Sequence, residues 1–346
     1  MPAPGEGRIS CQVIAGRLYQ THSSAYPLKI ISPQAHPDHP QSAFKPCINY
    51  ILSYGGGIVH GDRIHINAHA GKGCALIMLT QGSTKVYRHR KRPPPNTQIV
   101  ANNMADESFQ TLILEIDSGA LVCLLPDPVT CFRDARYNQR QAVRMQPGSS
   151  LVLLDWMTSG RMSRGERWDF QKYFSVNLIT HHPTSSPSAF ASDSVGSVGS
   201  IGSVGSIGSV GSIGSVGSVG SVVLRDALLL QKSNTGDSGG FSRRLENVDA
   251  FAFILVLGPA VTCVAEVFKE EHNRERVRPF RSNGSFHTVV DSVKWSVSEV
   301  DQEGVLGVAV RACGPSTEEL KAWIKRRLEL LQNIIGQSAW SMYFNA

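Results

Sequence analysis

The strongest constraint on the fold is a long succession of short segments in which apolar and polar residues alternate or β-branched and aromatic residues cluster. Both patterns are typical of β-strands. The segments that carry them are Ile64–Ala68, Phe109–Ile116, Ala120–Leu125, Arg136–Met145, Leu151–Trp156, Trp168–Thr180, Ser221–Leu230, Val248–Leu257, Val261–Phe268 and Val305–Arg311. They follow one another without the long helical connections that a doubly wound parallel sheet requires. The chain is therefore predicted to be mainly β.

One turn signal and one helical pattern refine this prediction. Asp117–Gly119 connects two expected strands directly, which predicts a β-hairpin. Near the end of the chain, Ser316–Glu319 have the pattern of a helix-capping box and follow a proline. Apolar residues then recur at helical spacing from Leu320 up to Gly336. We expect a C-terminal helix that packs on a sheet.

A tandem repeat interrupts the strand pattern. Residues 195–221 read Val/Ile-Gly-Ser nine times, a period that matches neither a strand nor an α-helix, and the run contains no proline, which argues against a collagen triple helix. A flexible, low-complexity insertion is predicted. The expected organisation is an N-terminal segment 1–44, a single β-rich domain over 45–182 and 241–336, the insertion at 183–240 and a C-terminal tail at 337–346.

The net charge limits which classes of partner the protein is expected to have. The chain has 34 basic and 28 acidic residues, a net charge of +6, and its densest basic cluster is Arg88–Arg92. Three prolines follow that cluster, so a solvated loop is favoured over a nucleic-acid contact, which stays open as an alternative.

No apolar run is long enough to span a bilayer, and the N-terminus has no secretory signal pattern. Seven cysteines without a C-x-x-C pair suit reduced thiols. We expect a cytoplasmic protein with no membrane partner.

Catalytic templates fit the sequence poorly. His65 and His69 share one face of an expected strand but lie about 13 Å apart, too far to bind one ion. Gly55–Gly57 and Gln81–Lys85 do not match a phosphate-binding loop. We found no serine nucleophile motif outside the repeat and no pair of carboxylates suited to acid–base catalysis. A binding or scaffold role is favoured, and a metal- or nucleotide-dependent enzyme on a β-rich scaffold remains the alternative from another class.

Four segments in order carry a family resemblance. Tyr54–Asp62, Leu79–Tyr87, Leu125–Tyr137 and Ser159–Glu166 together resemble the UreD family of urease accessory proteins, called UreH in some bacteria. With Val310-Arg311, the resemblance covers residues 45 to 335 apart from the insertion, as expected for a eukaryotic-type member. It implies a stacked-sheet, β-helix-like architecture and a non-enzymatic factor for urease maturation. It also implies that the protein binds urease apoprotein, a UreF-like helical accessory protein and a UreG-like GTPase. No permanent cofactor is expected, because nickel is only passed on to the urease.

The resemblance also suggests which residues act. A passage for nickel needs weak, successive oxygen or imidazole contacts, so Asp62, Glu166 and His60 are candidate transient nickel contacts. The alternative is that the two carboxylates bind turn backbones or pair with Arg63 or Arg161. His60 departs from the family pattern, which more often has a small residue there. Glycines of these segments are expected at tight turns. The residues expected to form the motif and partner surface are Gly55, Gly56, Gly57, Gly61, Gln81, Gly82, Thr84, Lys85, Asp127, Arg136, Tyr137, Gly160, Arg161 and Gly165. For Thr80–Lys85 and Pro126–Pro128 the passage wall is a second expected role, and plain structural turns are the alternative.

Overall fold

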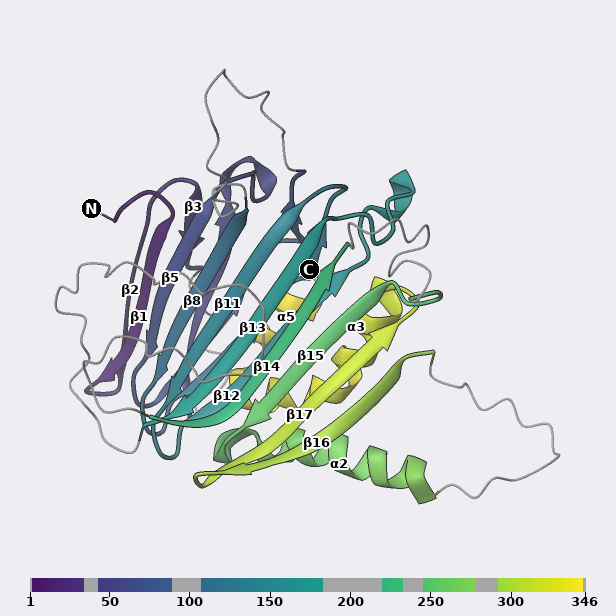
Figure 1. The fold of residues 1–346 in the computed structure, drawn as a ribbon. Coiled ribbons are helices and arrows are strands. Elements are labelled where there is room, and N and C mark those ends of the chain that lie inside the picture. The colour runs from purple at the N-terminus through teal and green to yellow at the C-terminus, as the bar shows by residue number, and fades with distance from the viewer. Residues whose placement is uncertain are drawn as a thin grey trace.

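The fold consists of two β-sheets that face each other, with helices behind one of them (Figure 1). The computed structural model describes residues 2–33, 43–88, 107–182, 220–232, 245–277 and 292–344. Sheet A has the strand order β14-β13-β11-β8-β5-β1-β2, and the ten-stranded sheet B has the main order β16-β17-β15-β12-β9-β6-β4-β3. The prediction of a mainly β protein is confirmed.

The strands have the following bounds. Sheet A contains β1 (Glu6–Ile14), β2 (Arg17–Ser24), β5 (Arg63–Ala70), β8 (Ser108–Ile116), β11 (Arg136–Met145), β13 (Lys172–His181) and β14 (Ser221–Gln231). Sheet B contains β3 (Leu28–Ile31), β4 (Lys45–Ser53), β6 (Cys74–Leu79), β7 (Thr84–Val86), β9 (Leu121–Leu125), β10 (Val129–Cys131), β12 (Ser150–Thr158), β15 (Ala250–Leu257), β16 (Lys294–Gln302) and β17 (Val305–Gly314).

From β4 to β13 the chain passes repeatedly from one sheet to the other. As a result β5, β8, β11 and β13 pair in parallel within sheet A, and β4, β6, β9 and β12 pair in parallel within sheet B. Each passage adds one strand to each sheet, which is the β-helix-like stacking that the family resemblance implies. Parallel strands here need no helical crossover, because the return strand lies in the opposite sheet.

The hairpin predicted at Asp117–Gly119 is wrong. The turn is present, but it carries the chain from β8 in sheet A to β9 in sheet B instead of pairing the two strands. All five residues of β9 are buried. This burial is typical of a central strand that is covered on both faces, whereas a hairpin strand often has one solvent-exposed face. A turn signal sets where the chain reverses, whereas burial decides which sheet it joins.

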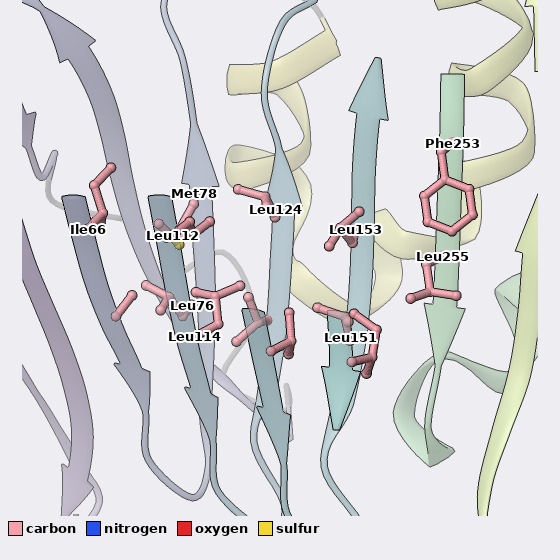
Figure 2. Close-up of a cluster of buried hydrophobic side chains, with 14 of the residues drawn as sticks. Ile66, Leu76, Met78, Leu112, Leu114, Leu124, Leu151, Leu153, Phe253 and Leu255 are labelled. Carbon is pink, nitrogen blue, oxygen red and sulfur yellow. The ribbon is translucent and has the colours of Figure 1, made fainter. Parts of the chain in front are cut away.

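The main core lies between the sheets. Ile66 and Leu112 of sheet A meet Leu76, Leu124 and Leu153 of sheet B in one apolar cluster (Figure 2). A second cluster fills the space between the other face of sheet B and the helices. Sheet B is therefore covered on both sides, and every residue of its central strand β12 is buried.

The helices are α2 (Thr262–Val277), α3 (Thr317–Leu328), α4 (Gln332–Ile335) and α5 (Gln337–Phe344). The strand predicted at Val261–Phe268 is wrong, since this segment starts α2. Its buried residues Val261, Val264, Ala265 and Phe268 follow a helical period, and that period outweighs the preference of valine for strands. The predicted cap of α3 is confirmed, because the Glu319 amide donates to Ser316 Oγ at 3.1 Å. The helix ends at Leu328 and a 3₁₀ turn, Glu329–Leu331, leads into α4.

Three segments expected outside the domain contribute regular structure to it. Within 1–44, β1 pairs with β5 and β3 pairs with β4. Strand β14 lies inside the range expected to be an insertion, and α5 of the expected tail buries Trp340 and Tyr343. Nearly all of the repeat, and all of the basic cluster except the exposed Arg88, lie outside the described residues. Among the helices that are described, none is long and apolar enough to cross a bilayer.

Candidate functional site

The four segments that carry the family resemblance lie against one another. The amide of Ile58 donates to Lys85 O at 2.8 Å, and the amide of Phe132 donates to Val86 O at 2.9 Å. β7 and β10 pair in parallel. The Arg161 guanidinium lies 3.8 Å from the centre of the Phe132 ring. These contacts join segments that are far apart in the sequence into one layer, which we call the motif loops: residues 54–62, 79–87, 125–137 and 159–166.

Two glycines show why the loops need this residue type. Gly160 has φ +139°, and a Cβ atom there would lie 2.7 Å from Glu166 O. Gly57 has an extended backbone, φ 168°, yet a Cβ atom would lie 2.5 Å from Lys85 O. The tight-turn role predicted for glycine holds at Gly55, Gly56 and Gly61, where φ is positive. At Gly57 the reason is instead the close approach of a neighbouring strand.

The two predicted nickel-contacting carboxylates have partners within the motif loops. Asp62 accepts a hydrogen bond from the Val59 amide at 2.9 Å, and partial burial raises its pKa. Glu166 accepts from Arg161 Nε at 2.8 Å and from the Arg133 amide at 3.2 Å. The hydrogen bond from Arg161 lowers the pKa of Glu166. Both contacts match the alternative reading, in which these carboxylates hold turns and pair with Arg161.

The other predicted residues divide between surface and interior. Gln81, Gly82 and Lys85 are exposed and Thr84 is half-buried. Asp127 accepts from the Gly82 amide at 3.0 Å and from Lys321 Nζ of α3 at 3.2 Å, which ties the motif loops to the helices. Asp127, Gly160 and Arg161 thus hold the layer together, and Arg136, half-buried, starts β11.

Tyr137 does not belong to a surface. Its side chain is fully buried, and its hydroxyl donates to Gln139 Oε1 at 3.2 Å. The side chain is therefore not available to a partner surface, which is the role predicted for it. His60 and Gly165 remain at the outer side of the motif loops, half-buried and exposed respectively.

A buried polar cluster that the sequence reading missed lies between the sheets. Asp155 of β12 accepts hydrogen bonds from Gln139 Nε2 at 2.8 Å, Ser175 Oγ at 2.6 Å and Asn177 Nδ2 at 2.9 Å. Burial raises the pKa of Asp155, and these hydrogen bonds oppose that shift. The signal in the sequence is that Gln139, Gln141, Ser175 and Asn177 occupy inward positions of alternating strands.

The cluster is part of a row that runs across both sheets. In sheet A, Gln141 pairs with Asn177 and Asn177 pairs with Asp226. In sheet B, Asp155 pairs with Phe253 and Phe253 pairs with Arg311. Asp226 and Arg311 form an ion pair that joins the two sheets. We call Gln141, Asn177, Asp226, Asp155 and Arg311 the polar row.

A cavity of about 60 Å³ connects the polar row with the motif loops. Its lining includes Thr80, Thr84 and Asp127 on the side of the motif loops, and Gln141 and Asp155 on the inner side. This volume holds a few water molecules. The amide oxygens of Gln141 and Asn177 are buried without a hydrogen-bond partner, so they are available to water or to a cation. Among the described residues, no group of three or more His, Cys, Asp or Glu can hold a metal ion as a closed site.

Comparison with known proteins gives one consistent family. Residues 5–344 match the family described as "UreD urease accessory protein". The chain is 29% identical over 349 residues to "Urease accessory protein D" of Oryza sativa subsp. japonica, which covers 97% of this chain and 94% of the rice protein. It is 28% identical over 352 residues to "Urease accessory protein D" of Arabidopsis thaliana, with 97% and 99% covered. It is 26% identical over 356 residues to "Urease accessory protein 4" of Cryptococcus neoformans, with 97% and 94% covered.

Proposed function

Because the chain belongs to the UreD urease accessory protein family, we propose that it matures urease by binding the urease apoprotein and assisting the delivery of nickel. It catalyses no reaction of its own in this proposal. The observation that carries the proposal is the family match over residues 5–344, together with the assembly of four distant segments into the motif loops. A catalytic role would instead need a set of reactive side chains in a pocket.

Nickel passes through the interior, between the motif loops and the polar row. Asp127 and Asp155 both line the cavity. Its polar lining consists of carboxylate, amide and hydroxyl oxygens, which bind a divalent cation weakly when they are few. A route needs such weak contacts, because a complete set of ligands would trap the ion. Asp62, Glu166 and His60 are additional transient contacts at the motif loops.

The motif loops also offer the partner surface. Large apolar side chains are exposed there: Tyr54 is 50% exposed, Val59 46% and Met162 51%. Exposed apolar side chains grouped with polar and charged ones such as Lys85 are common where proteins associate. The partners in this proposal are the urease apoprotein, a UreF-like helical protein and a UreG-like GTPase. The proposed location is the cytoplasm, and the seven unpaired cysteines suit a reducing compartment.

A reconstituted activation mixture tests the proposal. Purified urease apoprotein, the two accessory partners, GTP and nickel are combined with or without this protein, and urease activity is measured. We expect activity to depend on the protein and the protein to co-purify with the urease apoprotein and the helical partner. Activity that is equal without the protein, or failure to co-purify with either partner, would refute the function.

Within the same mixture, Asp62→Ala, Glu166→Ala and His60→Ala test the proposed nickel contacts. Arg161→Ala is the matched control, because it breaks the same ion pair but removes no nickel ligand. A loss of activation with Glu166→Ala that Arg161→Ala does not reproduce supports a nickel contact. An equal loss with both variants shows that Glu166 only holds the loop.

A further inference from the structure

A second pocket opens at the side of the sandwich, away from the motif loops. It has a volume of about 220 Å³ and lies between the edge strand β14 of sheet A and strands β16 and β17 of sheet B. Its charged lining consists of Arg225, Asp226, Glu299, Asp301 and Arg311, and the ring of Phe253 also lines it. Asp226 and Arg311 are also the outer members of the polar row, so the pocket meets the row at its edge.

The strand register shows what separates this pocket from the interior. Asn177 is the strand neighbour of Asp226, and Phe253 is the strand neighbour of both Asp155 and Arg311. The Arg311 guanidinium lies 5.6 Å from the centre of the Phe253 ring while it pairs with Asp226. The ion pair and the ring therefore occupy the positions between the pocket and the buried Asp155 and Asn177.

The ion pair is strongly asymmetric in exposure. The Asp226 side chain is 8% exposed, whereas that of Arg311 is 64% exposed. Water solvates the guanidinium when it is released, so the cost of separating the pair falls mainly on the buried Asp226 carboxylate. The buried carboxylate then keeps a negative charge that needs a cation. A divalent cation in the pocket is suited to replace the guanidinium.

A second observation points to a ligand at this place. The Asn177 amide oxygen is buried and lacks a hydrogen-bond partner, and Asn177 is fully buried beside Asp226. Buried amide oxygens without partners are rare in folded proteins. Carboxylate and amide oxygens, completed by water, are ligands that nickel and other divalent cations accept. Asn177 does not line the pocket itself, but it lies one strand inward from Asp226 and donates to Asp155, so it stands between the pocket and the interior end of the row.

We propose that the Asp226–Arg311 ion pair is a gate over a lateral binding site for a divalent cation, and that nickel exchanges between the pocket and the polar row there. This inference rests on the proposed function for the identity of the cation. With the pair closed, Arg311 neutralises Asp226 and repels cations. With Arg311 turned into solvent, Asp226 binds the ion and passes it toward Asp155.

Nickel titration of the full-length protein by calorimetry tests the gate. Arg311→Gln removes the competing charge, so we expect about tenfold tighter nickel binding, which corresponds to the loss of a modest ion pair. The double variant Arg311→Gln/Asp226→Asn is expected to lose this gain. Arg225→Gln is the matched control, because Arg225 is exposed and lines the same pocket. It is expected to change the affinity by less than about threefold.

Arg311→Lys keeps the charge but lacks the planar donor fork. Its nickel affinity is expected to lie between those of the wild-type protein and Arg311→Gln. This variant replaces Arg311→Gln in the test if Arg311→Gln fails to fold. If Arg311→Gln and Arg225→Gln raise the nickel affinity equally, the increase comes from the overall charge of the pocket, and the gate proposal is refuted. A gain that survives Asp226→Asn would overturn it as well. Urease activation is measured separately. Without activation by the wild-type protein the proposed function fails, whereas normal activation with unchanged nickel affinity of Arg311→Gln refutes only the gate.

Discussion

At the scale of single residues, Asp155 is the group on which the proposed passage depends most. It is buried, accepts three hydrogen bonds from neighbouring side chains and lines the cavity. Asp155→Asn keeps the shape and removes the charge, and its amide nitrogen also loses the hydrogen bonds that one carboxylate oxygen accepts. We expect nickel-dependent urease activation by the folded variant to fall about tenfold, as for one lost contact to a cation. Glu115→Gln is the control, since Glu115 pairs with the exposed Arg144. Unchanged activation by a folded Asp155→Asn protein would exclude Asp155 from the route.

Glu166 gives a prediction about pH. Arg161 holds the pKa of Glu166 below its ordinary value of 4.5, so the charged pair stabilises the folded chain above that pH. The stabilisation is lost as the pH falls through the lowered folded pKa. Glu166→Gln is expected to cost about 2 kcal/mol of unfolding free energy at pH 7. Urea unfolding between pH 3 and pH 7 measures this cost, and a difference that persists undiminished at the acid end would contradict it.

The motif loops were predicted from the sequence, whereas the polar cluster around Asp155 was not. The motif residues were found because each segment has a distinctive local sequence. Their glycines pointed correctly to turns at Gly55, Gly56 and Gly61, but not at Gly57. Gln139 and Gln141 were visible as polar residues on one face of a strand, but a two-residue period does not say which strand lies opposite. Asp155 sits in a continuous apolar run, Leu151–Trp156, and only the fold brings it to those amides.

At the scale of secondary structure, prediction succeeded where one pattern dominated and failed where two competed. Val261–Phe268 contains both β-branched residues and a helical period, and its burial in α2 follows the period. Asp117–Gly119 was recognised as a turn, but a hairpin and a passage between sheets begin with the same local signal. Strand β1 lacked any signal that placed it beside β5, since parallel pairing over that distance leaves no local trace.

Helix α5 gives a prediction at this scale. Trp340 is 3% exposed and its ring lies 4.2 Å from that of Phe344, centre to centre. Trp340→Ala is expected to destabilise the fold by about 3 to 5 kcal/mol, because it leaves a cavity against sheet B. Leu330→Ala, at a side chain 39% exposed, is the control and is expected to cost less than about 1 kcal/mol. Thermal unfolding compares them, and equal midpoints would show that α5 adds nothing to the core.

At the scale of the whole molecule, two apolar clusters pack the sheets against each other and the helices against sheet B. The main cluster joins the sheets, and sheet B shares its other face with α2, α3 and α5. The family resemblance implied this architecture, but composition and periodicity alone did not, because they do not show how strands are shared between two sheets. The match over residues 5–344 agrees with a fold in which both ends of the chain take part.

The repeat gives the prediction for the whole chain. Deleting residues 195–218 shortens a connection without removing any residue of a described strand or helix. We expect the thermal midpoint to change by less than about 2 °C and urease activation to stay at the wild-type level. A scrambled sequence of equal length is the control. Lost activation with an unchanged midpoint, restored by the scrambled version, would mean that a partner requires the length of this connection.

The pairing of His181 with Ser221 makes the fold tolerant of the copy number of the repeat. The chain leaves β13 and returns in β14 at adjacent positions of the same sheet, so the two ends are joined by hydrogen bonds whatever number of repeats separates them. Doubling the length of a chain connection costs only about 0.6 kcal/mol. Chains with different copy numbers of the repeat are therefore expected to adopt the same fold.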